Sequence, residues 1–273
     1  MNDPIQASAP KAVRGCYYLT LIASLIGAAI QMILLLSEYD TAIGMYRRDS
    51  VLAGIFIGFV ILVTALILAA PLLSRREPPL SVETLPAPDT PLIFASTLCG
   101  FILVAVLILQ SVTALPFGGL NVASDYFWLA VLVLSVPSAV YFFLPALPVK
   151  RKEGLEKAFS FFPVLWCMTY LMCVYFDKSA ALSSPVRILT QLAMIASMLF
   201  FLSELGIRVG RGCSRFLAPI INCAIFFSAI CAIPLISVAF INQWVLKADI
   251  LYSAVQLCFL TYFIARANTL FRR

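Results

Sequence analysis

Polar side chains inside long apolar runs are the residues of this sequence that could do chemistry. Four glutamines, Gln31, Gln110, Gln191 and Gln256, each interrupt a different run. A buried amide in a membrane either pairs with a neighbouring helix or lines a water-filled cavity. The glutamines therefore have two interpretations: one shared polar pocket that binds a solute, or separate hydrogen bonds between helices.

A second group of polar residues lies close to Gln191 in the sequence. Tyr175, Asp177 and Arg187 combine an aromatic hydroxyl with charges of both signs, between two apolar runs. Ionisable groups at such a position could form the mouth of a solute pocket, and they could equally form ion pairs at the membrane surface. We keep both interpretations and include these residues with the glutamines as candidate binding residues.

Glu204 and Arg208 form a separate candidate site. They stand four residues apart, so they can pair along one face of a helix. A proton-coupled carrier needs a carboxyl group within the membrane, which makes Glu204 a candidate proton site. Its position near the end of an apolar run also fits an ion pair at the membrane surface.

Several kinds of enzyme are excluded by the residues that the sequence lacks. The chain has no His, and its eight Cys include no Cys-x-x-Cys pair. Histidine-dependent acid–base chemistry and the usual zinc sites are therefore excluded, and no glycine-rich phosphate loop occurs. We assign no catalytic residue, no metal ligand and no cofactor, and we read the cysteines as packing residues.

Eight apolar runs must position the candidate residues, six of them free of charge and two interrupted near their ends by Glu204 and Arg266. The chain is 62% apolar and 12% charged, with a mean hydropathy of +1.01, which excludes a soluble domain of 273 residues. About 20 apolar residues cross the hydrocarbon core as a helix, whereas barrel strands would alternate in polarity. The sequence predicts an all-α, polytopic transmembrane bundle with eight spans at 16–37, 51–74, 91–115, 127–147, 158–176, 188–205, 217–242 and 250–267.

The basic residues predict the orientation of these spans. Fourteen of the nineteen Lys and Arg fall on the side that carries both termini, and five fall on the other. Lys and Arg in short loops are retained on the cytoplasmic side, so we expect both termini in the cytoplasm. The net charge of +6 is then this retention signal and not a nucleic-acid surface. The lipid bilayer is the expected partner, and the sequence does not indicate a protein partner or an oligomeric state.

We expect a single transmembrane domain over residues 1–273, with a hypothesis of two repeated halves at 14–150 and 158–270. An aromatic-Asp pair ends the first span at 39–40 and the fifth at 176–177, and each is followed by an arginine before the next span. A duplicated four-span unit explains this similarity. The general preference of aromatic and charged residues for membrane interfaces explains it equally.

Small residues and prolines indicate how the spans would pack. Pairs of small residues four apart allow close helix approach, and prolines kink or break helices. The small pairs are Ala23 with Gly27, Gly54 with Gly58 and Ser96 with Gly100, and the prolines within spans are Pro137, Pro163, Pro219 and Pro234.

One segment carries a resemblance to known proteins. It reads Ser183-Ser184-Pro185-x-Arg187-x-Leu189-x-Gln191-Leu192-Ala193 and continues to Met198-Leu199-Phe200-Phe201-Leu202-x-Glu204. It resembles a group of uncharacterised multi-span integral membrane proteins of anaerobic Gram-positive bacteria. The resemblance covers about 30 residues, implies a bacterial cytoplasmic membrane, and implies no activity.

Three functions are consistent with the sequence. The first is a transporter, or the membrane subunit of one, for a small solute or a lipid-like molecule. The second is a sensor or assembly module that does not transport and acts through its cytoplasmic loops. The third is a membrane-embedded enzyme, which no motif supports. A polar cavity reaching the middle of the membrane would favour the first, and a solid core the second.

Overall fold

The computed structural model describes residues 11–40, 44–73, 85–114, 123–147, 153–176, 183–210, 216–242 and 247–271. Within these ranges, eight helices are long and apolar enough to cross a membrane, which confirms the predicted all-α bundle of eight spans. The elements are α1 (Lys11–Ser37), β1 (Tyr39–Asp40), β2 (Met45–Tyr46), α2 (Val51–Leu73), α3 (Thr90–Ala114), α4 (Ala123–Phe143), the 3₁₀ turn η1 (Leu144–Ala146), α5 (Glu153–Phe159), α6 (Phe162–Phe176), α7 (Pro185–Arg208), α8 (Leu217–Asn242) and α9 (Lys247–Phe271).

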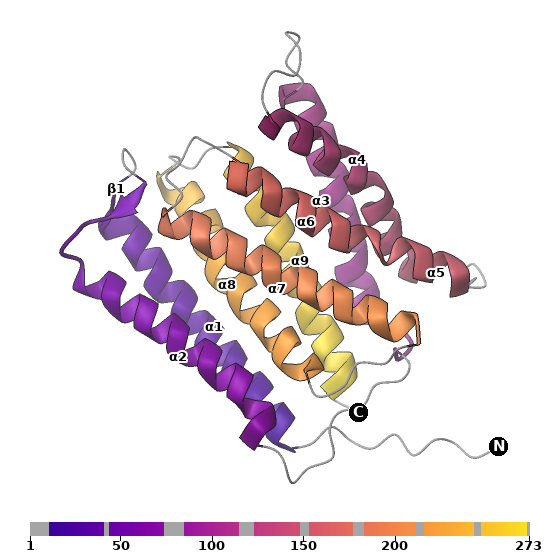
Figure 1. The fold of residues 1–273 in the computed structure, drawn as a ribbon, viewed down its shortest axis with the longest axis horizontal. Coiled ribbons are helices and arrows are strands. Elements are labelled where there is room, and N and C mark those ends of the chain that lie inside the picture. Colours follow the sequence, from indigo (N-terminus) through magenta and orange to yellow (C-terminus); the bar gives the residue numbers. More distant parts are fainter. Residues whose placement is uncertain are drawn as a thin grey trace.

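The helices run roughly alongside one another, with α1 and α2 at one edge and α4 at the other (Figure 1). The start of α1 lies beside the end of α9, where the Tyr17 hydroxyl donates to Asn268 Oδ1 at 3.3 Å. We call this end of the bundle the terminal side. The opposite end carries β1 and β2 and is called the hairpin side.

Six helices close a ring in which each packs against the next, in the order α3, α4, α6, α7, α8, α9 and back to α3. This six-helix ring takes two helices from the first predicted half and four from the second. α1 packs outside it against α8, and α2 packs against α1. The hypothesis of two superposable halves stays a prediction.

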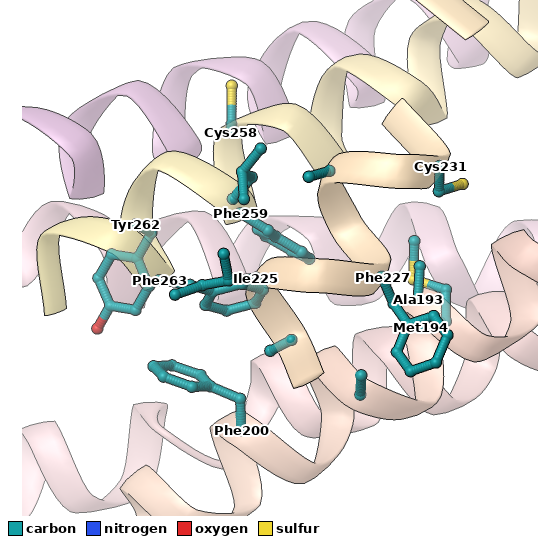
Figure 2. Packing of buried hydrophobic residues seen from close by; sticks show 14 of the residues in the cluster. Ala193, Met194, Phe200, Ile225, Phe227, Cys231, Cys258, Phe259, Tyr262 and Phe263 are labelled. Carbon is teal, nitrogen blue, oxygen red and sulfur yellow. The ribbon is translucent and has the colours of Figure 1, made fainter. Parts of the chain in front are cut away.

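The ring interior is filled by large apolar side chains, many of them aromatic. Figure 2 shows Phe200 of α7, Ile225 of α8 and Phe263 of α9 gathered between their helices. The rings of Phe200 and Phe263 lie 4.4 Å apart between centroids. Burial of such side chains away from lipid gives close van der Waals packing, which is the main force between helices inside a bilayer.

Two of the three predicted small-residue pairs lie at helix contacts. A Cβ on Gly27 would meet Ile230 of α8 at 2.8 Å, and one on Gly100 would meet the Phe143 ring of α4 at the same distance. Ser96, one turn before Gly100, donates to the carbonyl of Phe142 at 2.6 Å. Around Gly54 and Gly58 nothing lies within 4 Å of a Cβ, so no described helix approaches α2 closely at this pair.

The prolines differ in their effect. Pro163 stands at the second residue of α6, and the fifth span is broken there into α5 and α6. A proline ring clashes with the carbonyl four residues earlier and lacks an N–H, so a helix cannot run smoothly through it. Pro137 and Pro234 lie inside α4 and α8, which continue as helices on both sides.

Candidate functional site

A buried ionic cluster lies inside the ring at the terminal side, centred on Glu204 of α7. Arg266 of α9 forms an ion pair with Glu204 Oε1 through Nη2, and its Nε donates to the same oxygen at 3.0 Å. The Tyr262 hydroxyl lies 3.0 Å from both carboxylate oxygens. The Glu204 side chain is 3% exposed and that of Arg266 is 5% exposed, so the pair belongs to the protein interior.

Arg208 joins this cluster to two further helices. Its Nη2 lies 3.4 Å from Glu204, so the ion pair predicted from their spacing is present. Its Nη1 pairs with Glu156 of α5 at 2.8 Å, and its guanidinium lies over the Tyr141 ring of α4, 5.3 Å from the centroid. The cluster therefore ties α4, α5, α7 and α9 together with two positive and two negative charges.

A second polar group lies at the middle of α9. Gln256 is 1% exposed, and its Nε2 donates to Ser228 of α8 at 2.7 Å and to Ser197 of α7 at 3.0 Å. Its Oε1 is buried without a hydrogen-bond partner. An amide oxygen that is buried in hydrocarbon without a hydrogen-bond donor is energetically unfavourable.

A third polar group lies in the ring toward the hairpin side. Gln110 of α3 lies next to the hydroxyl of Tyr252 of α9, without a hydrogen bond of good geometry between them. Both side chains are buried, and both the amide oxygen and the hydroxyl lack a partner. Tyr252 stacks on Tyr170 of α6 at 4.2 Å between centroids and contacts Trp128 of α4.

Aromatic rings lie between the level of Gln256 and the ionic cluster. Trp166 of α6 and Phe142 of α4 both contact Phe259 of α9, at 5.7 and 5.8 Å between centroids. Phe142 also contacts Tyr262, the tyrosine of the ionic cluster, at 5.4 Å. The indole of Trp166 is held by a 2.9 Å hydrogen bond to Ser135 of α4. An aromatic layer therefore lies in the ring between the level of Gln256 and the ionic cluster.

Gln31 lies outside the six-helix ring. It is buried on α1, and its Oε1 accepts a 2.7 Å hydrogen bond from the Tyr46 hydroxyl of β2. Burial raises the pKa of the Tyr46 phenol, so this donor keeps its proton at neutral pH. Positive φ at Gly44 lets the chain turn into β2. Gln31 thus holds the hairpin onto α1 and does not meet Gln110 or Gln256.

Arg187 has a clear structural contact at the start of α7. Its Nη2 donates to the last carbonyls of α6, those of Val174 and Tyr175, the second at 2.6 Å. A cation at a helix C-terminus satisfies free carbonyls and the helix dipole together. The Tyr175 side chain itself is exposed, and Gln191 is half-buried in the second turn of α7. Asp177 lies outside the described residues.

The candidate residues therefore divide by location. The ring interior contains Gln110, Gln256, Glu204 and Arg208, whereas Gln31 holds the hairpin on α1 and Arg187 joins the start of α7 to the end of α6. Whether any of them binds a solute stays a prediction. Sequence reasoning missed Arg266, which was treated only as the end of the eighth span. The four-residue spacing of Tyr262 and Arg266 on one helix face was the available signal.

The arrangement offers hydrogen-bond donors and acceptors without a metal site, since no group of three His, Cys, Asp or Glu among the described residues could hold a metal ion. No protein-family model matches the chain, and neither a curated protein nor a solved structure is significantly similar to it. Eight apolar helices make the chain an integral membrane protein, and any narrower function has to be argued from the geometry.

Proposed function

We propose that this protein is a carrier, or the membrane subunit of one, for a small polar solute that passes through the six-helix ring. The observation that carries the proposal is the set of polar groups at three depths inside the ring. We further propose that the terminal side faces the cytoplasm, because most basic residues fall there.

The cost of these groups supports a role beyond packing. Polar and ionisable side chains in a membrane are rare, and they mostly face a bundle interior that serves a transport path. Here Gln110, Tyr252 and Gln256 each keep one buried polar atom without a partner. A bundle selected only for stability would gain by replacing them with apolar residues of similar size. A solute with hydroxyl, amide or carbonyl groups would satisfy these atoms.

In this conformation, aromatic side chains block the path of a solute through the ring. The ring interior between the level of Gln256 and the ionic cluster is filled by Trp166, Phe142 and Phe259. Transport would require these rings to separate, first toward one side and then toward the other. Pro137 and Pro234 lie in two ring helices, α4 and α8, where a missing backbone hydrogen bond provides a site for bending.

Substituted-cysteine accessibility tests the proposal. Ser197→Cys and Ser228→Cys, each made in a variant without the native cysteines, place a thiol beside Gln256 with little change in volume. Vesicles of each orientation are treated with a small membrane-impermeant methanethiosulfonate. A carrier is expected to expose these thiols to reagent from both sides, because the ring opens alternately.

Leu34→Cys is the matched control. Leu34 is as fully buried as Ser197, but it lies on α1 outside the ring and should stay unmodified. If the thiols at 197 and 228 are as protected as that at 34 from both sides, the ring is a solid core and the transport proposal is wrong.

A non-transporting assembly module is the second candidate, and one observation favours it. Only 22% of the α2 span is buried, and open space lies beside Gly54 and Gly58. Such a small-residue face suits another membrane helix. Gly54→Leu with Gly58→Leu should then lower the mass of the complex in detergent, whereas Ile57→Phe, on the same exposed helix, should not. An unchanged mass in both would remove this support.

A further inference from the structure

The ionic cluster at the terminal side of the ring leaves two buried guanidinium N–H groups without an acceptor. Arg266 donates to Glu204 through Nε and Nη2, and its Nη1 is buried without a partner. Arg208 donates to Glu156 through Nη1 and to Glu204 through Nη2, and its Nε is buried without a partner. Arg266 as a whole is 4% exposed.

Unpaired guanidinium N–H groups in a buried site require an acceptor. The planar guanidinium matches carboxylate and phosphate oxygens, which it binds through two parallel hydrogen bonds. The Tyr262 hydroxyl, which donates to Glu204, and the Tyr141 hydroxyl lie 3.3 Å apart beside these guanidinium groups. Without Glu156, the two arginines and Glu204 carry one net positive charge.

We propose that this cluster is a binding site for an oxyanion, a phosphate or carboxylate group, which binds between Arg208 and Arg266 in place of Glu156. The ligand would supply acceptors to Arg266 Nη1 and Arg208 Nε while Glu204 stays on Arg266. The inference does not rest on the proposed transport, because binding is measured without movement of any solute.

Glu156 is the group that a ligand would displace. Its side chain is 18% exposed, the most accessible of the four charged side chains in the cluster. It stands on α5, a short helix separated from α6 by the break before Pro163. α5 can therefore swing away from Arg208 without unwinding α6, and the carboxylate of Glu156 then acts as an internal competitor for the site.

Two sources could supply the oxyanion, the phosphate of a membrane lipid or a soluble anion. Purified protein in a neutral detergent is melted with inorganic phosphate at constant ionic strength, and separately with dioleoyl phosphatidic acid. Dioleoylglycerol, which has the same chains without the phosphate, is the control for the lipid. A rise in melting temperature with inorganic phosphate assigns a soluble anion, and a rise with phosphatidic acid alone assigns the lipid headgroup.

Three variants test where the anion binds. Glu156→Gln should tighten binding about two- to fivefold, the range expected when a partly exposed ion pair is released. The double variant E204Q/R266Q, which removes the central pair without leaving an isolated charge, should lose the response. Arg47→Gln removes an exposed arginine on the hairpin side and should keep it.

The proposal is overturned by either of two results. One is the absence of a shift with both inorganic phosphate and phosphatidic acid, in the wild type and in Glu156→Gln alike. The other is an equal shift in E204Q/R266Q and the wild type, which would assign the anion to another part of the surface. Because the readout is the ligand-induced shift of each variant, a change in that variant's own stability does not imitate either result.

Discussion

Removing the charge of Glu204 should destabilise the protein more than removing any other single carboxylate of the ionic cluster. Glu204 is 3% exposed and faces Arg266 and Arg208, so Glu204→Gln leaves two guanidinium groups without their central carboxylate. Breaking a buried ion pair on one side costs about 3–5 kcal/mol. Arg266→Gln should cost a similar amount, because it leaves Glu204 in an apolar interior with Arg208 at 3.4 Å as its remaining cation.

The two losses should not add. In E204Q/R266Q the isolated charges are gone, and Arg208 keeps its pair with Glu156. The remaining cost is that of altered hydrogen bonds, about 1–2 kcal/mol, so the double variant should be more stable than either single variant. A double variant that is more stable than either single variant is expected for a buried ion pair. Two independent surface contacts cannot produce this result.

Unfolding by sodium dodecyl sulfate in mixed micelles measures these free energies, with the fluorescence of the buried Trp166 as one reporter. Glu156→Gln is the matched control, because its partly exposed pair with Arg208 should contribute no more than about 1 kcal/mol. Equal small losses in Glu204→Gln and Glu156→Gln would refute the buried position of Glu204. So would a double variant whose loss is the sum of the two single losses.

Three further perturbations give contrasting results in the same unfolding assay. Gly27→Ala should lower the free energy of unfolding by about 1–3 kcal/mol through overpacking, because its Cβ would stand 2.8 Å from buried Ile230. Gly54→Ala, with open space around it, should not lower it. Equal effects of the two substitutions would contradict the packing of α1 on α8. Tyr46→Phe should cost about 1–3 kcal/mol, since Gln31 Oε1 loses its donor. Because burial raises the pKa of Tyr46, its contribution is complete below about pH 10 and should decline above it, and Tyr46→Phe should lack that decline. Arg187→Lys keeps the charge but loses the planar guanidinium whose Nη2 donates to the carbonyls of Val174 and Tyr175, so it should recover only part of the stability lost in Arg187→Gln. Full recovery would show that charge alone matters.

The spans could be predicted from sequence because one physical requirement dominates them. A helix that crosses hydrocarbon has to be apolar over about 20 residues, and the structure places a helix over every predicted run. The helix ends were less predictable. α7 extends to Arg208, beyond the predicted end near 205, because Glu204 and Arg208 are neutralised by partners inside the protein and need not mark the membrane surface.

The partners of buried groups could not be predicted, since lipid-facing and protein-facing positions are equally apolar. Ile61 is 64% exposed and Phe56 is 2% exposed, and no difference in residue class reveals which one faces protein. Local spacing identified Arg208 as a partner of Glu204 but could not identify Arg266, which is 62 residues away. The partners of the glutamines could not be predicted either, because depth along a span says nothing about the direction in which a side chain points.

The inward face of α9 connects these observations. Tyr252, Gln256, Phe259, Phe263 and Arg266 follow one another at helical spacing and are all buried. The polar members meet different helices, α3 through Gln110, α7 and α8 through the two serines, and α7 again through Glu204. Apolar packing alone would tolerate a small slide or rotation of α9, since lipid and side chains are equally apolar. The hydrogen bonds of Gln256 and Arg266, at two depths, do not tolerate it, because one movement of α9 would break both sets together. A displacement of α9 caused by anion binding at the ionic cluster would therefore be felt at the hairpin side of the ring.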